Sequence, residues 1–239
     1  MIKINNLTKK YKDKLAVDNL NLEIKTGELF SLLGTNGAGK TTTIKMLSTL
    51  ILPTSGEVDI NNLDLVKDSS KIKEIINISP QETAVASNLT VLENLYFMAG
   101  IYQIPNKEDK IKELIKLFKL EEVLKQKAKT LSGGYQRKLS IAISLINNPK
   151  ILFLDEPTLG LDVISRHDLW KVIETLKGKT TIILTTHYME EAESICDRVV
   201  LMNNGKIITI GTPEEIRKKT NTSNLREAFF ALTGGDNDE

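Results

Sequence analysis

The sequence has little cysteine, no long apolar run and almost no excess charge, and each shortage excludes a class of protein. Cys196 is the single cysteine among 239 residues, so no internal disulfide can form and a reducing compartment fits. No window approaches the ~18–20 consecutive apolar residues that span a bilayer. The first residues, MIKINNLTKKYKDK, lack the apolar stretch of a secretory signal. We therefore expect a cytoplasmic protein that reaches a membrane only through a partner.

The charge balance is close to neutral, with 32 Lys and Arg residues against 31 Asp and Glu residues and a net charge of +1. Such a balance provides no electrostatic reason to expect a nucleic-acid partner. The neighbourhood of Cys196, with Ala192, Ile195 and Val199, predicts a small buried hydrophobe rather than a nucleophile.

The first third of the chain alternates short β-rich runs with turns. LNLEI and ELFSLLG, joined by Lys25, Thr26 and Gly27, are interpreted as a hairpin whose second strand leads into a glycine-rich loop. TTTIKMLSTLIL has helical apolar spacing and predicts a helix that ends at Pro53. GEVDINNLDL and IINIS are interpreted as further strands.

From about residue 82 to residue 148 the pattern becomes helical, which predicts an inserted helical subdomain. Strands resume at KILFLD and TTIILTTH, with a helix around ISRHDLWKVIETLK between them. That β-α-β order indicates a parallel sheet with both faces covered. Trp170 is expected in the core, and LMNNGKIITI predicts a hairpin that turns at Asn204 and Gly205.

The stretch GTNGAGKTT matches the phosphate-binding pattern G-x-x-x-x-G-K-[ST] in full, after a strand and before a helix. Its glycines let the backbone N–H groups turn inward, and the helix N-terminus adds positive potential. Lys40 is expected to reach the β- and γ-phosphates, and the Thr41 hydroxyl to bind Mg²⁺. The predicted nucleotide loop comprises Gly34, Thr35, Asn36, Gly37, Ala38, Gly39, Lys40, Thr41 and Thr42.

Two further strands are followed by residues that suit phosphate chemistry. ILFLDEP ends in two carboxylates, of which Asp155 can hold Mg²⁺ and Glu156 can polarise a water for attack on the γ-phosphate. His187 follows the strand TTIILTT and can donate a hydrogen bond to the γ-phosphate, whereas His167, in mid-helix, is assigned a structural role. Gln81, after a strand and Pro80, can place an amide near Mg²⁺ or water.

The stretch TLSGGYQRKLS adds a second glycine pair behind a serine, but it lacks the lysine of a phosphate-binding loop. Phosphate loop, isolated glutamine, LSGG, strand with Asp-Glu and post-strand histidine occur in that order along the chain. This order resembles the nucleotide-binding domain of ATP-binding-cassette (ABC) proteins over nearly the whole chain. The resemblance implies a P-loop NTPase of the α/β class: a RecA-like core with an antiparallel β-subdomain and an inserted α-helical subdomain.

The resemblance also implies roles for single residues. Tyr11 matches the aromatic that stacks on adenine, with Val17 beside it, and Gln81 matches the residue that senses Mg²⁺ and faces a membrane partner. Glu156 matches the catalytic base, Asp162 the D-loop and His187 the switch histidine. The ABC signature is matched by Ser132, Gly133 and Gly134, with Tyr135 in place of the usual glutamine. The implied cofactors are ATP and Mg²⁺, with Thr41, Gln81 and Asp155 around the metal.

The whole chain, 1–239, is expected to form one ATP-binding domain. Residues 1–81 and 149–220 would make the RecA-like and β core, 82–148 the helical subdomain with the signature, and 221–239 a C-terminal helix followed by a disordered acidic tail. In that helix Leu225, Phe229 and Leu232 share one face, which can pack on the body or on a partner.

EPTLGLD, TTHYMEEAE and NLREAFFALTG resemble the ATPases of ABC-2-type exporters, including drug-resistance and sodium-export systems. The implied protein dimerises on ATP, with Ser132, Gly133 and Gly134 gripping the nucleotide of the opposite copy. It would drive a separately encoded membrane permease from the cytoplasmic face. Two alternatives stay open: a regulatory or assembly ATPase without a permease, and the ATPase of an importer.

Overall fold

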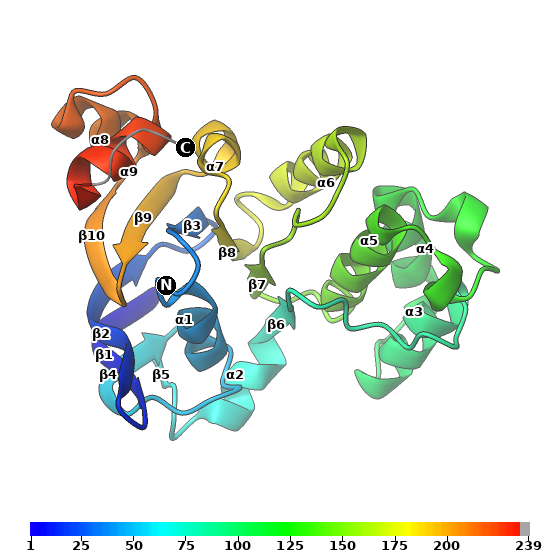
Figure 1. Ribbon diagram of the computed structural model, residues 1–239. Helices are drawn as coiled ribbons and strands as arrows, with labels where there is room; N and C mark the ends of the chain where they lie inside the picture. Colours follow the sequence, from blue (N-terminus) through cyan, green and yellow to red (C-terminus); the bar gives the residue numbers. More distant parts are fainter. Residues whose placement is uncertain (235–239) are drawn as a thin grey trace.

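The structure, a computed structural model, describes residues 1–234 as two β-sheets with helices around them (Figure 1). The antiparallel sheet has the strand order β2-β1-β4-β5, and the larger sheet has the order β10-β9-β3-β8-β7-β6. The smaller sheet comprises β1 (Ile2–Tyr11), β2 (Lys14–Ile24), β4 (Ser55–Ile60) and β5 (Leu63–Asp64). The larger comprises β3 (Leu29–Leu33), β6 (Ile76–Ser79), β7 (Ile151–Asp155), β8 (Thr181–Thr186), β9 (Arg198–Asn203) and β10 (Lys206–Gly211).

Five neighbouring strands of the larger sheet, β9, β3, β8, β7 and β6, run parallel, so their carboxyl ends lie at one edge. Only β10 is antiparallel, and it returns from β9 through Asn204 and Gly205, both with positive φ. That turn confirms the predicted hairpin. Ligands of open parallel sheets bind at the carboxyl edge. We therefore expect a binding site among the loops that follow β3, β6, β7 and β8.

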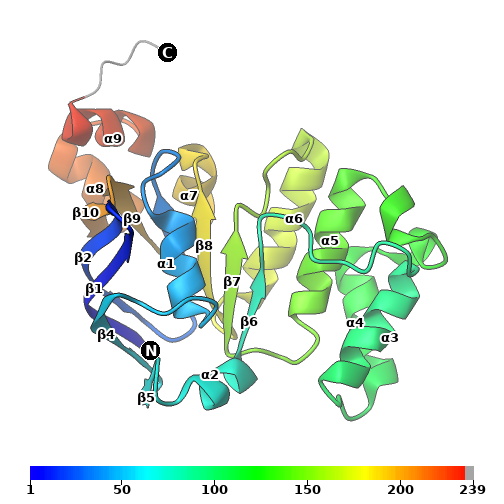
Figure 2. The same cartoon turned by 60° about the horizontal axis from the view of Figure 1, so that its bottom comes forward.

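Both faces of the larger sheet are covered, because successive residues of β7 and β8 belong to two different apolar clusters. Ile151 and Phe153 face the cluster shared with the antiparallel sheet, while Leu152 and Leu154 face the opposite cluster. The buried apolar side chains of α1 and α2 belong to the first of these clusters and those of the other α-helices to the second. Figures 1 and 2 show α3, α4 and α5 at the end of the sheet beyond β7 and β6, and α8 and α9 at the opposite end, beside β9 and β10. The α-helices are α1 (Lys40–Leu47), α2 (Ser69–Ile75), α3 (Val91–Ile101), α4 (Lys107–Phe118), α5 (Gly133–Ser144), α6 (Val163–Leu176), α7 (Met189–Ile195), α8 (Pro213–Thr220) and α9 (Leu225–Thr233).

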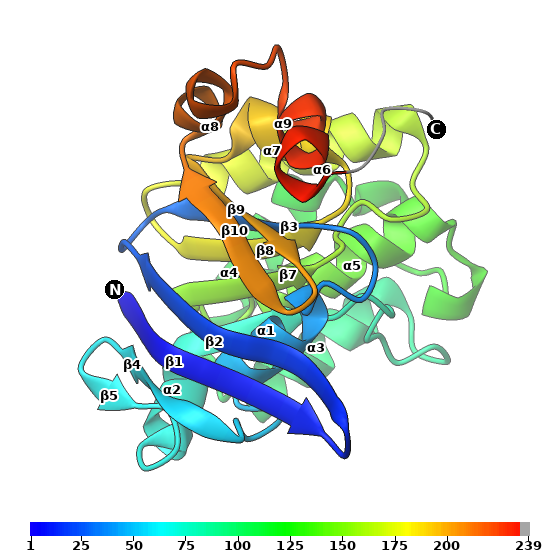
Figure 3. The ribbon, with the colours of Figure 1, turned by 60° about the vertical axis from the view of Figure 1, so that its left-hand side comes forward.

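The hairpin predicted across residues 25–27 is wrong. Figure 3 shows β2 beside β1 in the antiparallel sheet, whereas β3 lies in the larger sheet between β8 and β9. The burial patterns explain the difference: all five residues of β3 are buried, and the second half of β2 alternates between buried and exposed positions. A continuous apolar run is typical of a central parallel strand, and alternation is typical of a sheet with one open face.

The helix predicted to run as far as Pro53 is too long. Helix α1 ends at Leu47, and Thr49 adopts a left-handed conformation with φ +62°. Leu50, which has helical spacing in the sequence, is 59% exposed, whereas Ile51 packs against the apolar cluster beside the antiparallel sheet. The apolar spacing in the sequence continues beyond the helix because the loop after α1 brings the Ile51 side chain back to the core. The helix α2 was missed, since its seven residues carry little periodic signal.

Several other predictions are confirmed. Helices α3, α4 and α5 occupy the stretch with helical spacing, and α6 lies between β7 and β8. Trp170 and Cys196 are buried, at 8% and 7% exposure, and burial raises the pKa of the Cys196 thiol. His167 lies exposed in the middle of α6, and its assignment to a structural role stays a prediction. Within residues 1–234 no helix is long and apolar enough to cross a membrane. The predicted disorder of the acidic tail concerns 235–239, which lie outside the described residues.

Helix α9 packs on the body of the protein as its apolar face predicts. Leu225 and Phe229 are 0% and 4% exposed, and Leu232 packs against the same apolar cluster. Asn224 caps the helix, because its side chain accepts a hydrogen bond from the backbone N–H of Glu227 at 2.9 Å. Helix α9 is thereby held against α7 and α8.

We predict that Phe229→Ala lowers the free energy of unfolding by about 3 kcal/mol, because it removes a buried ring and leaves a cavity. Phe97→Ala is the matched control: Phe97 is 55% exposed, and the same change there should stay within about 0.5 kcal/mol. Chemical denaturation of both variants measures the difference. Equal losses at the two positions would contradict the packing described for α9.

Candidate functional site

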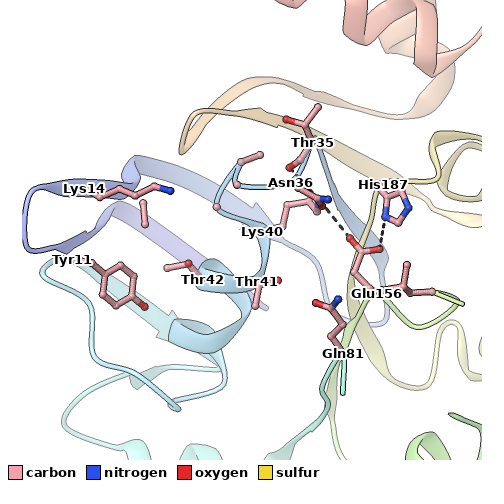
Figure 4. A pocket seen from close by; sticks show the side chains of 15 residues that line it. Tyr11, Lys14, Thr35, Asn36, Lys40, Thr41, Thr42, Gln81, Glu156 and His187 are labelled. Atoms are coloured by element: carbon pink, nitrogen blue, oxygen red, sulfur yellow. Dashed lines mark hydrogen bonds and ion pairs between the residues drawn. The ribbon is translucent and has the colours of Figure 1, made fainter. Parts of the chain in front are cut away.

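A cavity of about 320 Å³ opens at the carboxyl edge of the larger sheet (Figure 4). It is lined by the loop after β3, by Gln81 after β6, by Glu156 and Leu159 after β7, and by His187 after β8. The β1–β2 hairpin of the antiparallel sheet closes one side with Tyr11, Lys14 and Ala16. The lining includes every residue of 34–42 except Gly34. The parallel register therefore brings together the residues predicted from separate motifs.

The loop after β3 owes its shape to its glycines. Gly39 has φ +100°, and a Cβ there would lie 2.6 Å from the carbonyl oxygen of Ala16. At Gly34, with φ +152°, a Cβ would lie 2.3 Å from the carbonyl oxygen of Met202. Neither position tolerates a side chain unless the backbone around it moves. The loop is consequently pressed between the hairpin and β9, and it curls around the cavity.

Helix α1 begins without a side-chain cap, because Gly39 occupies its N-cap position. The first N–H groups of a helix have no partner within it, and with the helix dipole they attract an anion. Lys40 adds a full positive charge at this point, with its side chain only 6% exposed. Its Nζ donates to the carbonyl oxygens of Gly34 at 2.6 Å and Thr35 at 3.3 Å. The loop is therefore built to receive phosphate.

Glu156 is buried at 6% exposure and pairs with two groups across the cavity. Its Oε1 lies 3.5 Å from Lys40 Nζ and its Oε2 lies 3.0 Å from His187 Nδ1, as the dashed lines in Figure 4 show. The backbone of Glu156 is left-handed with φ +48°, and its N–H donates to the Thr185 hydroxyl at 3.0 Å. Backbone strain of this kind gathers at functional sites, because the surroundings must hold it in place.

The residues predicted to surround Mg²⁺ present only oxygen donors. Asp155 is 3% exposed, and its Oδ1 accepts hydrogen bonds from the hydroxyls of Thr41 at 3.0 Å and Thr185 at 2.5 Å. Gln81 points its amide into the cavity (Figure 4), which Thr41 also lines and Asp155 does not. Hydroxyl, carboxylate and amide oxygens are hard ligands, and Mg²⁺ usually takes one or two of them and completes its shell with water and phosphate. The set fits Mg²⁺, although within residues 1–234 no cluster of three His, Cys, Asp or Glu side chains could hold a metal by itself.

The far end of the cavity differs from the sequence-based prediction in one residue. Tyr11 is 44% exposed, lines the cavity and carries Lys9 Nζ 5.1 Å above its ring, an arrangement open to stacking on a base. Val17 is completely buried and does not line the cavity. Strand alternation explains this, because the neighbouring Ala16 faces the cavity and Val17 faces the core. Lys14 was missed, since only the hairpin register Tyr11↔Lys14 brings it to the site.

The signature residues and Asp162 do not line this cavity. Ser132 caps α5, and its Oγ accepts from the backbone N–H of Tyr135 at 3.4 Å. Asp162 caps α6 and accepts from the Ser165 hydroxyl at 2.6 Å, and that hydrogen bond is the main reason the pKa of Asp162 is lowered. A Cβ on Gly134 would lie 2.7 Å from the same Ser165 hydroxyl. Gly134 and Asp162 are therefore neighbours on a second surface, while the Tyr135 side chain packs against the core.

Comparison with known proteins shows a family to which this chain is similar over most of its length. The family model described as "ABC transporter" matches residues 17–159. The probable multidrug ABC transporter ATP-binding protein YbhF of Escherichia coli is 39% identical over 97% of this chain, which spans only 41% of YbhF. The linearmycin resistance ATP-binding protein LnrL of Bacillus subtilis is 38% identical over 96% of this chain and 78% of LnrL.

Among solved structures, the dimeric post-hydrolysis state of the ATP-binding cassette MJ0796, bound to ADP and Pi, superimposes with a TM-score of 0.80. It is 30% identical, and the match covers 89% of this chain and 98% of the other. This likeness confirms the predicted fold class, an α/β P-loop NTPase.

We predict that Lys40→Ala weakens ATP binding about 10- to 100-fold, because the variant loses a charged donor to the phosphates. Isothermal titration calorimetry with ATP measures the dissociation constant. Lys45→Ala is the matched control, since Lys45 lies on the same helix but is exposed, and its affinity should match that of the unmodified chain. Unchanged affinity in Lys40→Ala would contradict the role given to the loop.

Proposed function

This chain belongs to the ABC transporter family of ATP-binding proteins, and on that premise we propose that it hydrolyses ATP to drive a membrane permease of the ABC-2 exporter type. One observation carries most of the weight: Glu156, Lys40 and His187 meet beside an uncapped helix N-terminus. A carboxylate, a cation and an imidazole at a phosphate-binding loop suit phosphoryl transfer to water.

Each residue of the site has a task in this reaction. The N–H groups of the loop and Lys40 bind and orient the phosphates, and the exposed ring of Tyr11 offers a surface for adenine. The Thr41 hydroxyl and Asp155, with Gln81 nearby, would hold Mg²⁺, which would supply positive charge against the phosphates. Glu156 accepts a proton from the attacking water, and His187 donates a hydrogen bond to the γ-phosphate.

Glu156 and Lys40 form an ion pair that a γ-phosphate would disturb. Lys40 Nζ lies 3.5 Å from Oε1 of the Glu156 carboxylate, and its N–H groups are equally suited to phosphate. Phosphate binding would shift Lys40 toward the nucleotide and leave Glu156 free to polarise water. The contact of His187 Nδ1 with the carboxylate, at 3.0 Å, would give way in the same manner, because the one N–H of a neutral imidazole can be donated either to Glu156 or to the γ-phosphate. The base is thus released by the substrate that it acts upon.

We propose further that two copies close around ATP. Ser132, Gly133 and Gly134 lie outside the cavity that holds Lys40, so one chain supplies them to another rather than to itself. Beside Asp162, Val163 and Ile164 are 79% and 77% exposed, which is unusual for aliphatic side chains and suits an interface. The MJ0796 cassette bound to ADP and Pi is itself described as dimeric.

A membrane permease is the proposed second partner. Helix α3 exposes Tyr96, Phe97 and Ile101 at 39%, 55% and 56%, an apolar surface that suits a protein contact. The names of YbhF and LnrL point to drug export. Affinity purification from membranes tests this: recovery of a multi-span membrane protein supports the transporter, and its absence favours a regulatory or assembly ATPase. Uptake rather than efflux in reconstituted vesicles would favour an importer.

We predict that Glu156→Gln lowers the ATPase rate at least about 100-fold, because the amide cannot accept the proton of water. The variant should retain ATP and accumulate as a dimer in size-exclusion chromatography with light scattering. Glu174→Gln removes an exposed carboxylate on α6 and should leave both properties unchanged. Hydrolysis by Glu156→Gln at the rate of the unmodified chain would show that another group is the base.

We predict that Ser132→Arg abolishes ATP-driven dimerisation and hydrolysis but leaves ATP binding by the monomer within about twofold. The arginine fills the surface meant for the partner's phosphate and does not touch the cavity of its own chain. Ser194→Arg, at an exposed position of α7, controls for the added charge. Dimerisation and turnover that survive in Ser132→Arg would refute the shared site.

A further inference from the structure

Arg137 is a buried cation in helix α5 that the proposed reaction does not use. It is 4% exposed, and its guanidinium donates to the carbonyl oxygens of Pro80, at 2.7 Å, and Gln81. Within residues 1–234 no carboxylate lies within 4.0 Å of it, so it forms no ion pair there. Burial is the main cause of a lowered pKa for Arg137, while the charge of Asp155 acts in the opposite direction.

A buried cation without a paired anion is costly, and a well-packed apolar residue at such a place is often equally stable or more so. The two carbonyl groups accept hydrogen bonds from part of the guanidinium but do not neutralise its charge. The effect of the arrangement is to fix the geometry of the backbone. A planar guanidinium that binds two successive carbonyls sets the path of the backbone at Pro80 and Gln81 in a way that a single donor cannot.

A second contact fastens the same two segments. Ser140 Oγ lies 3.1 Å from Ser79 Oγ, and both residues are buried, at 3% and 1% exposure. Positions 137 and 140 are three residues apart and therefore share one face of α5. Helix α5 is thus joined to Pro80 and Gln81 by a charged donor and to the end of β6 by a contact between two neutral hydroxyls.

The two ends of this connection belong to different nucleotide sites. The Gln81 side chain points into the cavity of its own chain (Figure 4). Arg137 lies four residues beyond Gly133 on the same helix, about 6 Å along the axis, and Ser132 caps that helix on the surface outside the cavity. Arg137 does not line the cavity, and its hydrogen bond to the Gln81 carbonyl connects it to a residue that does.

We propose that Arg137 is a positioning residue that couples the two nucleotide sites of the dimer. It holds the backbone of Gln81 so that occupancy of one cavity sets the position of α5, and with it the Ser132–Gly134 surface offered to the other copy's nucleotide. This inference rests on the proposed dimer. Because coupling between sites is reciprocal, engagement of Ser132 by the partner would in turn stabilise the position of Gln81.

A double-mutant cycle tests the coupling. In the Glu156→Gln background, the ATP concentration for half-maximal dimerisation is measured by light scattering for Arg137→Met, Gln81→Ala and the double variant. Gln81→Ala keeps the carbonyl that Arg137 binds and removes only the side chain. We expect Arg137→Met to raise that concentration about tenfold when Gln81 is present, within the usual range of coupling between sites, and less than twofold when it is absent.

Ser140→Ala is the matched control, because it loosens the same helix without contacting Gln81, and its effect should be equal in both backgrounds. ATP binding by the monomer, measured in the Ser132→Arg background, should stay unchanged in Arg137→Met. Arg137→Lys keeps a cation but not the two-pronged contact, so it should show the same Gln81-dependent shift should the methionine variant fail to fold.

Equal shifts in the two Gln81 backgrounds would overturn the coupling and leave Arg137 a packing residue, while the dimer itself would stand. Failure of the Glu156→Gln parent to dimerise at any ATP concentration would refute the proposed dimer, and the coupling with it. The two failures are therefore distinguishable in the same experiment.

Discussion

The buried carboxylate of Glu156 is the group on which the whole site depends. It follows β7, yet it pairs with Lys40 from the loop after β3 and with His187 after β8. A carboxylate at 6% exposure is tolerable only with partners, since an unpaired buried charge costs several kcal/mol. The loops after β3, β7 and β8 are therefore held together because this one buried carboxylate needs partners. In the proposed reaction an incoming phosphate would compete with Glu156 for Lys40, which would link substrate binding to the freedom of the proposed base.

The two glycine-rich loops differ in how the free N–H groups at the start of the following helix find a partner. Helix α1 has glycine at its N-cap and leaves its first N–H groups to a ligand, with Lys40 to add charge. Helix α5 is capped by its own Ser132 and has no lysine at that end. The first can hold phosphate alone, whereas the second is fit only to add contacts to a phosphate that another loop already holds. This asymmetry is the physical basis for the proposal that two copies share a site.

Pattern reasoning succeeded where local chemistry dictates the structure. The full phosphate-loop pattern, the Asn204–Gly205 turn and the apolar strand before Asp155 each indicate one conformation. The sequence patterns gave wrong predictions where segments that are adjacent in the chain lie apart in the structure. β2 and β3 are adjacent in sequence but enter different sheets, and only the contrast between alternating and continuous burial could have separated them. The end of α1 was placed too late for a similar reason, because Ile51 returns to the core from a loop rather than from a helix.

By itself the sequence determined which residues could handle phosphate, magnesium and water, since those properties belong to the side chains and to the glycines between them. Tertiary structure alone decided which of them meet. The parallel register brings Gln81, Glu156 and His187 to one edge, strand alternation places Ala16 rather than Val17 in the cavity, and the hairpin adds Lys14. It also decided that Arg137 binds the backbone of Gln81. Contacts between residues far apart in the chain depend on packing, which no local pattern encodes.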